Sequence, residues 1–401
     1  MTTRPFAQPS PAHGPTPRPL HGPWVQRRNL MVALGASTAA MSLPLWAQPS
    51  AASKADILIG RSTALTGGMA PFLAPLHEGQ EAAIADANAK GGIGGRKIRL
   101  VSLDDGFDPR RTLENAKQLN EKDGVLALLG VSGTSQVMTL LPYLAQAKLP
   151  LIGVYTGSPA IRAQQHPYLF TTRASYADEL VKIVRNLVAV QSSRIGVAFE
   201  NNDFGKLLLP LVEKTIAAEG ASLAGTHALA AAGEDANEAA KALAAQRPQA
   251  VLLIAAGPPV VAYVRAHRAH LGVPVYTLSL GAGTAMLKAL GEDARGLAVA
   301  RTGPSPSKPT IQLTRDFQAS MKHHDKPVDY DRYTGYMDAR VLIEGLRAAG
   351  PGVTRASLVQ GIESLGNLDL GGYAYQFSPQ NHHGSNYVDI AVVGSGGVFR
   401  Q

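Results

Sequence analysis

The chain has 401 residues, of which 45% are hydrophobic and 17% charged, and a mean hydropathy of −0.01, so it is long enough to bury one large or two medium cores. Its formal net charge is +8, but four arginines in residues 1–52, where no acidic residue occurs, supply half of that excess. The remainder is mildly basic and has no basic helix interleaved with aromatic residues, so we expect no nucleic-acid partner. The sequence contains no cysteine, which excludes disulfides, thiolate metal sites and cysteine nucleophiles.

Residues 1–52 have the features of an export signal and are left out of the fold. The pair Arg27-Arg28 precedes a short apolar segment, which resembles a twin-arginine signal. Cleavage is expected near Ala47 or Ala52. The apolar segment is too short to span a membrane, and no cysteine follows it that could carry a lipid anchor. An ordinary secretory signal and a start codon placed too far upstream are the alternatives.

Strand-like and helix-like patterns alternate over the next part of the chain. The glycine run 91–95 follows a helix, whereas a dinucleotide-binding fingerprint follows a strand, so we interpret it as a turn. Asp104 and Asp105 end a strand, where turn capping is favoured over acid/base catalysis or metal binding. The expected elements are strand 55–60, a loop over 61–75, helix 78–88, strand 97–103 and helix 108–122.

The stretch 125–158 predicts a strand, a helix over 136–148 and a second strand, in the manner of buried parallel strands. Ligands of open α/β sheets bind beyond the carboxyl ends of the strands, beside helix N-termini with free N–H groups. The polar residues at these two ends are Ser132, Thr134, Thr156 and Ser158. They could hold a carboxylate or an amide, and no nucleophile–base pair accompanies them. The stretch therefore predicts a binding site without catalysis.

The same alternation continues to the C-terminus. Strands alternating with helices predict an α/β fold with parallel sheets, and two successive blocks of the pattern predict two similar Rossmann-like lobes. The histidine clusters at 323–324 and 382–383 lack the spacing of metal ligands, so no metal is expected. Further strands are expected at 167–172, 195–200, 221–228, 250–255, 274–280, 296–302 and within 373–400, and further helices at 175–190, 207–220, 237–246, 258–270, 284–290, 310–323, 331–349 and 354–365.

A series of short motifs runs through residues 54–401. They are 57–60 with Leu65-Thr66-Gly67, Glu78-Gly79, the run 88–95, Asp104-Asp105 with Asp108-Pro109, the loops at Gly130 and Thr156, the run 202–205, and Tyr375-Gln376-Phe377. Together they resemble the leucine/isoleucine/valine-binding family, which are periplasmic substrate-binding proteins of ABC transporters with the type I periplasmic-binding fold. The resemblance implies two lobes joined by three crossovers, near 171–174, 301–305 and 377–386. Lobe 1 would hold residues 54–172 and 303–376, and lobe 2 would hold 174–300 and 377–401.

The resemblance also implies a ligand-binding set in the cleft between the lobes. Phe72 and Phe204 fall where the family places aromatic rings, although packing within their own lobes is an alternative for both. The match between the family's binding loop and the segment around Thr156 has an alternative that is shifted by one residue. The predicted set is Phe72, Ser132, Thr134, Val154, Thr156, Phe204, Gly257 and Ser279.

Two departures from the family bear on the ligand. The loop 279–283 has no carboxylate, whereas the amino-acid binders of the family present an acid there to the ammonium of the ligand. The loop 256–259 lacks an aromatic hydroxyl, and Phe107 stands where a disulfide cysteine is frequent. We therefore expect a ligand with a carboxylate or amide but no buried ammonium, such as an aromatic or short-chain acid.

The function that these features imply is an exported, periplasmic receptor that captures a small-molecule ligand and delivers it to the membrane subunits of an ABC permease. We expect a monomer without cofactor or metal and without enzymatic activity. A ligand sensor of the same fold that acts on a signalling partner is the first alternative. A hydrolase using Ser132, Asp104 or Asp105 is the second.

Overall fold

The computed structural model describes residues 55–400, which belong to one unit of the chain, 51–401. The export signal expected at 1–52, with its arginine pair and cleavage sites, lies outside the described residues. Among the described residues, no helix is both long and apolar enough to cross a membrane.

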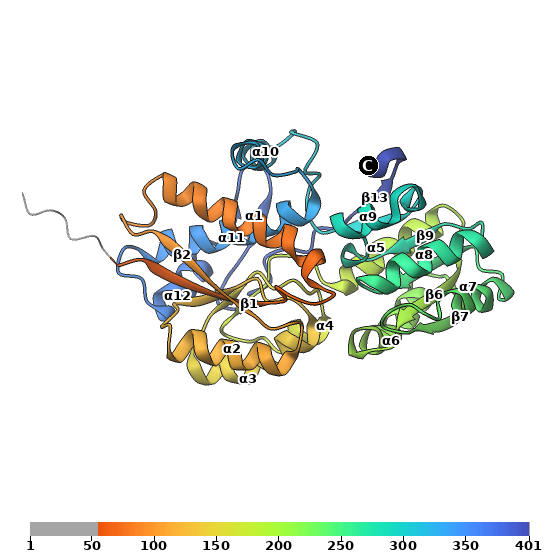
Figure 1. Ribbon diagram of the computed structural model, residues 1–401, viewed down its shortest axis with the longest axis horizontal. Helices are drawn as coiled ribbons and strands as arrows, with labels where there is room; N and C mark the ends of the chain where they lie inside the picture. Colours follow the sequence, from red (N-terminus) through yellow and green to blue (C-terminus); the bar gives the residue numbers. More distant parts are fainter. Residues whose placement is uncertain (1–54, 401) are drawn as a thin grey trace, which may run out of the picture. The chain divides into compact units, whose positions relative to one another are not determined.

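The first sheet has five parallel strands. They are β1 (Ile57–Thr63), β2 (Ile98–Asp104), β3 (Ala127–Leu129), β4 (Leu151–Ile152) and β5 (Leu169–Phe170), in the order β2-β1-β3-β4-β5. The helices that accompany them are α1 (Ala70–Ala89), α2 (Pro109–Glu121), α3 (Thr134–Ala147), α4 (Pro159–Arg162), α10 (Gln312–His323), α11 (Tyr330–Ala349) and α12 (Arg355–Ser364). In Figure 1, α2 and α3 cover one face of the sheet, and α1 and α11 cover the other. These elements form the first lobe.

The second sheet has seven strands in the order β14-β13-β10-β9-β8-β6-β7. Its strands are β6 (Arg194–Glu200), β7 (Ser222–Leu229), β8 (Ala250–Ile254), β9 (Val275–Thr277), β10 (Ala298–Arg301), β13 (Asp389–Val393) and β14 (Phe399–Arg400). Its helices are α5 (Tyr176–Ala189), α6 (Asp203–Ala218), α7 (Ala236–Ala245), α8 (Pro258–His270) and α9 (Thr284–Leu290), with short 3₁₀ turns at Ser279–Ala282, Gly291–Ala294 and Ser395–Gly397. The strands from β6 to β10 are parallel, whereas β13 and β14 are antiparallel additions. These elements form the second lobe.

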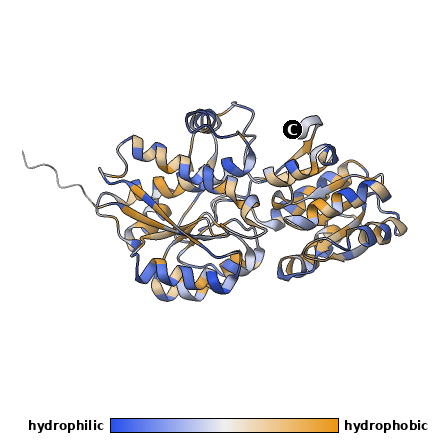
Figure 2. Cartoon of the chain, viewed as in Figure 1, coloured by the Kyte–Doolittle hydropathy of each residue, from blue (hydrophilic) through white to orange (hydrophobic). Residues whose placement is uncertain are grey.

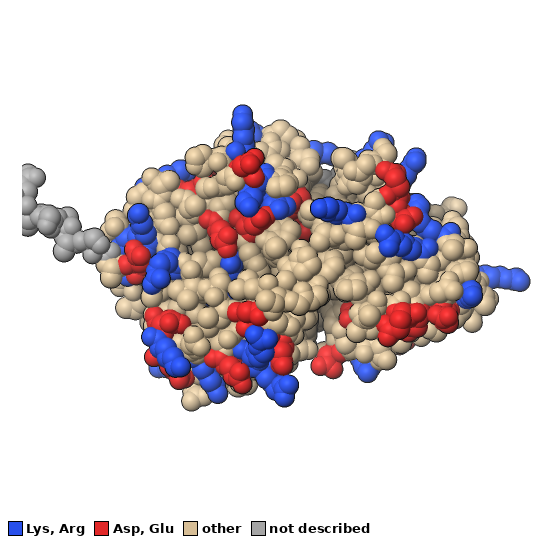
Figure 3. Space-filling model, in the orientation of Figure 1, with Lys and Arg blue, Asp and Glu red and all other residues tan. Residues whose placement is uncertain are grey.

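The predicted α/β fold with two parallel-sheet lobes is confirmed, and its cores follow the sheets. Every residue of β3 and β8 is buried, as expected for strands covered on both faces. Figure 2 shows hydrophobic residues along the strands and mixed hydropathy along the covering helices. On the face seen in Figure 3, basic and acidic side chains occur together over both lobes.

The central strand–helix–strand unit forms as expected, because β3, α3 and β4 lie within the ranges that the sequence indicates, to within two residues. Beyond them, a two-stranded antiparallel ladder joins β11 (Asn367–Asp369) to β12 (Ala374–Gln376). The crossover segment at Thr171 lies beside the later one, since its backbone N–H donates to the carbonyl of His382 at 2.9 Å. The exact lobe boundaries derived from the sequence remain predictions.

Two helices begin earlier than the sequence indicates. The loop expected over 61–75 is wrong for its last part, because α1 starts at Ala70 and includes Phe72. Pro71 is tolerated in the first turn, where its missing N–H would have no intrahelical partner, and Pro75 lies inside the helix. Proline-rich composition therefore gave a misleading loop signal.

Phe204 lies in the first turn of α6 rather than at a loop tip. Asn202 caps this helix by accepting a hydrogen bond from the N–H of Gly205 at 3.1 Å. A Cβ at Gly205 would lie 2.0 Å from the carbonyl oxygen of Glu200, so the glycine permits close packing of the helix start on the strand end. Gly205 is therefore needed for packing at the helix start, and the helix begins before the predicted residue 207.

Candidate functional site

A cavity of about 460 Å³ opens between the carboxyl ends of strands from both lobes. We call it the cleft cavity. The first lobe contributes the start of α3, and the second lobe contributes the end of β6 and the start of α6. The residues that line it are Met69, Phe107, Pro109, Gly133, Thr134, Ser135, Gln136, Tyr176, Glu200, Asn201, Asn202, Asp203, Phe204, Lys206, Ala256 and Leu280.

A smaller space of about 60 Å³, which we call the inner cavity, adjoins the cleft cavity. The two share the lining residues Met69, Phe107, Gly133, Ala256 and Leu280. The inner cavity is also lined by Phe72, Leu73, Ser132, Tyr155, Gly257, Gly283, Met286 and Asp331. The two cavities are therefore adjacent, and we treat them together as the candidate site between the lobes.

Five of the eight predicted site residues line these cavities. Thr134 and Phe204 line the cleft cavity, whereas Phe72, Ser132 and Gly257 line the inner cavity. The ring of Phe72 packs against the core of the second lobe rather than of its own. The ring of Phe204 meets that of Tyr176 edge to face, with centroids 5.5 Å apart. The structure thus brings these five residues together.

The other three predicted residues are buried and line neither cavity. Val154 is buried in the core of the first lobe. The hydroxyl of Thr156 lies 2.9 Å from that of Thr134 and accepts a hydrogen bond from the N–H of Ser158 at 3.3 Å. Ser279 is engaged by other protein groups, since its N–H and hydroxyl both donate to the carboxylate of Glu179, at 2.7 and 2.8 Å. Their assignment to the ligand site stays a prediction.

Tyr155 lines the inner cavity one residue after Val154, in keeping with the register left open in the sequence. Its hydroxyl donates to Oδ1 of Asp331 at 3.2 Å, and the guanidinium of Arg173 lies 4.7 Å from its ring centre. Burial raises the pKa of Tyr155 well above its ordinary value, so the hydroxyl stays a hydrogen-bond donor at neutral pH.

Asp331 is a site residue that the sequence analysis missed. It belongs to α11 of the first lobe, is 3% exposed and lines the inner cavity. Its Oδ2 accepts a hydrogen bond of 2.6 Å from the N–H of Thr284 at the start of α9, in the second lobe. Asp331 therefore links the two lobes directly beside the cavity. No local motif around it marks this role, because its partners lie far away in the sequence.

Glu200 is a second missed residue. It ends β6, is 8% exposed and lines the cleft cavity. Burial raises the pKa of Glu200 above its ordinary value, partly offset by a hydrogen bond from the backbone N–H of Ala256. Its position at a strand's carboxyl end, directly before the helix that carries Phe204, is a signal that could have identified it.

A buried pair of opposite charges supports the crossover between the lobes. Arg173 and Glu179 are both fully or nearly fully buried, and both contact the hydroxyl of Ser279. Burial raises the pKa of Glu179, although the charge of Arg173 opposes this shift. The pair fixes the loop that carries Ser279 against the segment that enters α5.

The acidic pair Asp104 and Asp105, weighed above as a catalytic or metal-binding candidate, is held by hydrogen bonds around a turn. No group of three or more metal-ligating side chains occurs within 55–400. Asp104 accepts hydrogen bonds from Leu65, Thr66 and Gly106, which hold its pKa well below its ordinary value, and Asp105 accepts from Ser62 and Thr112. Both carboxylates thus stabilise the turn, which agrees with the interpretation favoured from the sequence.

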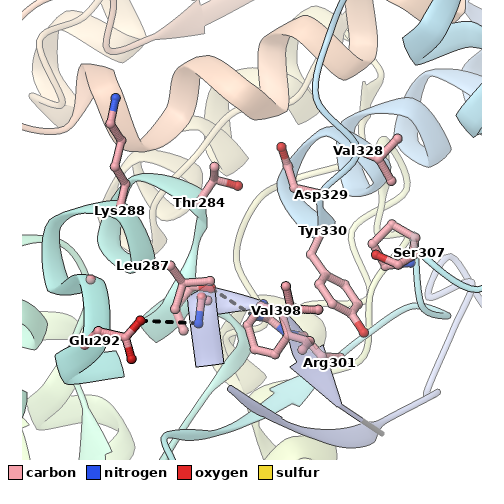
Figure 4. A pocket seen from close by; sticks show the side chains of 16 residues that line it. Thr284, Leu287, Lys288, Glu292, Arg301, Ser307, Val328, Asp329, Tyr330 and Val398 are labelled. Atoms are coloured by element: carbon pink, nitrogen blue, oxygen red, sulfur yellow. Dashed lines mark hydrogen bonds between the residues drawn. The ribbon is translucent and has the colours of Figure 1, made fainter. Parts of the chain in front are cut away.

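Another cavity, also of about 460 Å³, lies beside α9 and the start of α11 (Figure 4). In it the guanidinium of Arg301 packs against the rings of Tyr330 and Phe399, 4.3 and 4.0 Å from their centres, and the two rings also meet each other edge to face. None of the predicted site residues lines this cavity. Thr284 lines this cavity, and its N–H donates a hydrogen bond to Asp331, which lines the inner cavity.

Comparisons with known proteins identify the family. The family model described as periplasmic binding protein matches residues 56–397. A crystal structure from Ralstonia solanacearum, described as a substrate-binding periplasmic protein, is 30% identical with a TM-score of 0.79, covering 86% of this chain and 99% of that one. One from Rhodopirellula baltica, described as a "possible leucine/isoleucine/valine-binding protein", is 26% identical with a TM-score of 0.80, covering 87% of this chain and 97% of that one.

A curated relative adds a local match. The Leu/Ile/Val-binding protein homolog 2 of Brucella abortus is 44% identical over 78 residues, so the match covers 20% of this chain and 21% of that relative's length. Because the family model spans most of the chain and the related structures share its two lobes, the protein belongs to the periplasmic binding protein family and has the fold of its leucine/isoleucine/valine-binding members.

Proposed function

We propose that this protein is an exported receptor of an ABC importer, which captures a small organic ligand between its lobes. The observation that supports this most is the pair of adjoining cavities, whose walls come from the strand ends of both lobes. A ligand there contacts both lobes only when they are together, so binding stabilises the closed arrangement. Membrane permease subunits would recognise that arrangement and accept the ligand in the periplasm.

The ligand is amino-acid-like, an amide or a carboxylate. Ser132 and Thr134 follow β3 at the cavity walls, and the backbone N–H groups at the start of α3 lie beside them. Hydroxyl and N–H donors of this kind suit carboxylate or amide oxygens. The rings of Phe72, Phe107 and Phe204 provide apolar walls for the remainder of the ligand.

The proposal is tested by a thermal-shift screen of the purified protein, unfolded and refolded to strip any captured ligand. The panel comprises amino acids, amides, aromatic carboxylates and short dicarboxylates. A ligand that binds only the folded state raises the melting temperature. We expect at least one compound to do so, and Phe204→Ala to reduce that shift. Shifts that survive substitution of every cavity-lining residue tested would place binding elsewhere and contradict the proposal.

A further inference from the structure

Glu200 places a buried negative charge in the wall of the cleft cavity. Its Oε1 accepts a hydrogen bond from Nδ2 of Asn202 at 2.7 Å, and its Oε2 accepts from the N–H of Ala256 at 3.3 Å. Both donors are neutral. No cation within residues 55–400 forms an ion pair with this carboxylate, and Lys206, which lines the same cavity, is exposed. The charge is therefore buried without a protein counter-charge.

The hydrogen bonds use both carboxylate oxygens, but they do not supply a counter-charge. A glutamine has one acceptor oxygen and would turn its NH₂ group toward one of the two donors. The carboxylate still loses the water around its charge on burial, and the raised pKa of Glu200 reflects this cost. A cationic group entering the cavity would supply the missing counter-charge.

The other charges around the cavities do not compete for this role. Asp203 is exposed on α6 and accepts a hydrogen bond from Ser135 at 3.4 Å. Asp331 is buried, but Tyr155 and Thr284 already donate to its two oxygens, and its charge interacts with Arg301. Among the acids that line the two cavities, Glu200 is the buried one whose charge interacts with no cation of the described residues.

Aromatic rings complete a suitable environment for a cation. Phe107, Tyr176 and Phe204 line the same cavity as Glu200. The faces of such rings attract ammonium groups, most strongly where water is excluded. A carboxylate together with several rings is the combination that holds an organic amine, whereas an anionic ligand would be repelled by the same wall.

We propose that Glu200 binds the positively charged nitrogen of the ligand and thereby selects amine-bearing compounds. This rests on the proposed function, that the cleft holds a small organic ligand. The acid comes from the end of β6 rather than from the loop 279–283, which has none. The expectation of a ligand without a buried ammonium was derived from the loops 279–283 and 256–259, and this proposal replaces it.

Isothermal titration calorimetry on stripped protein tests the inference with two matched series of compounds. One series comprises leucine, its deaminated analogue isocaproate and its decarboxylated analogue isoamylamine. The other comprises phenylalanine, phenylpropionate and phenethylamine. The variants are Glu200→Gln, which keeps the shape, removes the charge and replaces one acceptor oxygen by an NH₂ group, and Glu200→Asp, which keeps the charge on a shorter stem. Glu213→Gln, an exposed carboxylate on α6 that lines neither cavity, is the control.

We expect the best ligand of wild type to carry an amine and to bind at least about tenfold more tightly than its deaminated analogue, as for a buried charged pair. Glu200→Gln should abolish that preference, Glu200→Asp should retain part of it, and Glu213→Gln should leave it unchanged. Tighter binding of the deaminated acids, or a preference that survives Glu200→Gln, would overturn the inference and leave the receptor function standing. No binding by any of the six compounds would count against both.

Discussion

The hydroxyl oxygens of Thr134 and Thr156 lie 2.9 Å apart and join the start of α3 to the segment that follows β4. Thr134 lines the cleft cavity, whereas Thr156 is buried behind it and also meets the hydroxyl of Tyr176 at 3.4 Å. Residues from two neighbouring strand ends therefore form one polar unit, in which Thr156 orients the hydroxyl that faces the cavity.

Removing that orienting hydroxyl should weaken ligand binding. Thr156→Val keeps the side-chain volume but leaves the hydroxyls of Thr134 and Tyr176 without their shared partner. We expect a loss of about 1–3 kcal/mol in binding free energy, measured by calorimetry, as for other stranded buried polar groups. Thr226→Val, on the exposed edge strand β7, is the control and should bind normally. Unchanged affinity of Thr156→Val would mean that Thr134 needs no such support.

The contact between α1 and α11 depends on two glycines. A Cβ at Gly79 would lie 1.9 Å from the carbonyl oxygen of Arg332, and a Cβ at Gly335 would lie 1.9 Å from that of Leu76. Gly79→Ala should therefore force the helices apart and lower the free energy of unfolding by about 3 kcal/mol. Urea denaturation measures this change, and Gly352→Ala, which has open space around it, should cost much less. Equal effects of the two substitutions would show that the helices separate without cost.

The lobe-bridging contact of Asp331 should contribute to closure around any ligand. Asp331→Ala removes the acceptor of the hydrogen bonds from Thr284 and Tyr155. We expect about a tenfold loss of affinity for amine-bearing and deaminated ligands alike, because the closed state itself becomes less stable. Calorimetry with both ligand classes separates this from Glu200→Gln, which should affect amines selectively. A selective loss in Asp331→Ala would instead assign the ammonium contact to Asp331.

Asp338 should make stability depend on pH. It is 1% exposed, its Oδ1 accepts from the hydroxyl of Thr172 at 2.5 Å, and burial raises the pKa of its carboxyl to about 7. The folded state therefore keeps a proton that the unfolded state, with a pKa of about 3.9, releases. The contribution of this proton to the free energy of unfolding is therefore fully present below about pH 4 and is lost as the pH rises to about 7.

Asp338→Asn should remove that dependence. Relative to wild type, the variant should gain free energy of unfolding between about pH 4 and about pH 7, by at most about 4 kcal/mol. Urea denaturation across this range measures the difference, with Glu213→Gln, an exposed carboxylate on α6, as the control. Parallel pH profiles for wild type and Asp338→Asn would show that the carboxyl titrates equally in both states.

The alternation of strands and helices could be read from the sequence because parallel buried strands are short apolar runs, as in β3 and β8. Local composition gave wrong helix starts where proline and glycine lie within helices rather than in loops. Pro71 and Pro75 lie in α1, and Gly205 lies in the first turn of α6, so Phe72 and Phe204 were placed in loops although helices carry them. Both rings nevertheless reach the cavities, because the helix starts lie at the same sheet edges.

The charged residues of the site could not be predicted from sequence patterns in the same way. Asp331 accepts hydrogen bonds from Tyr155 and Thr284 beside the inner cavity. These three residues lie too far apart in the sequence for a local pattern to reveal their contact. Glu200 was visible as the last residue of a strand, but its burial without a cation emerges only when β6, α6 and the loop at Ala256 pack together. The expectation drawn from the loops 279–283 and 256–259 therefore took no account of the acid at the end of β6.

Small-angle X-ray scattering of the stripped protein, with and without the ligand that gives the largest thermal shift, tests the central claim most directly. A receptor that captures its ligand between two lobes should close on binding, so the radius of gyration should fall at saturation. Phe204→Ala and Asp331→Ala should shift that transition to higher ligand concentration. An unchanged radius of gyration at ligand saturation, confirmed by calorimetry on the same sample, would contradict capture by lobe closure.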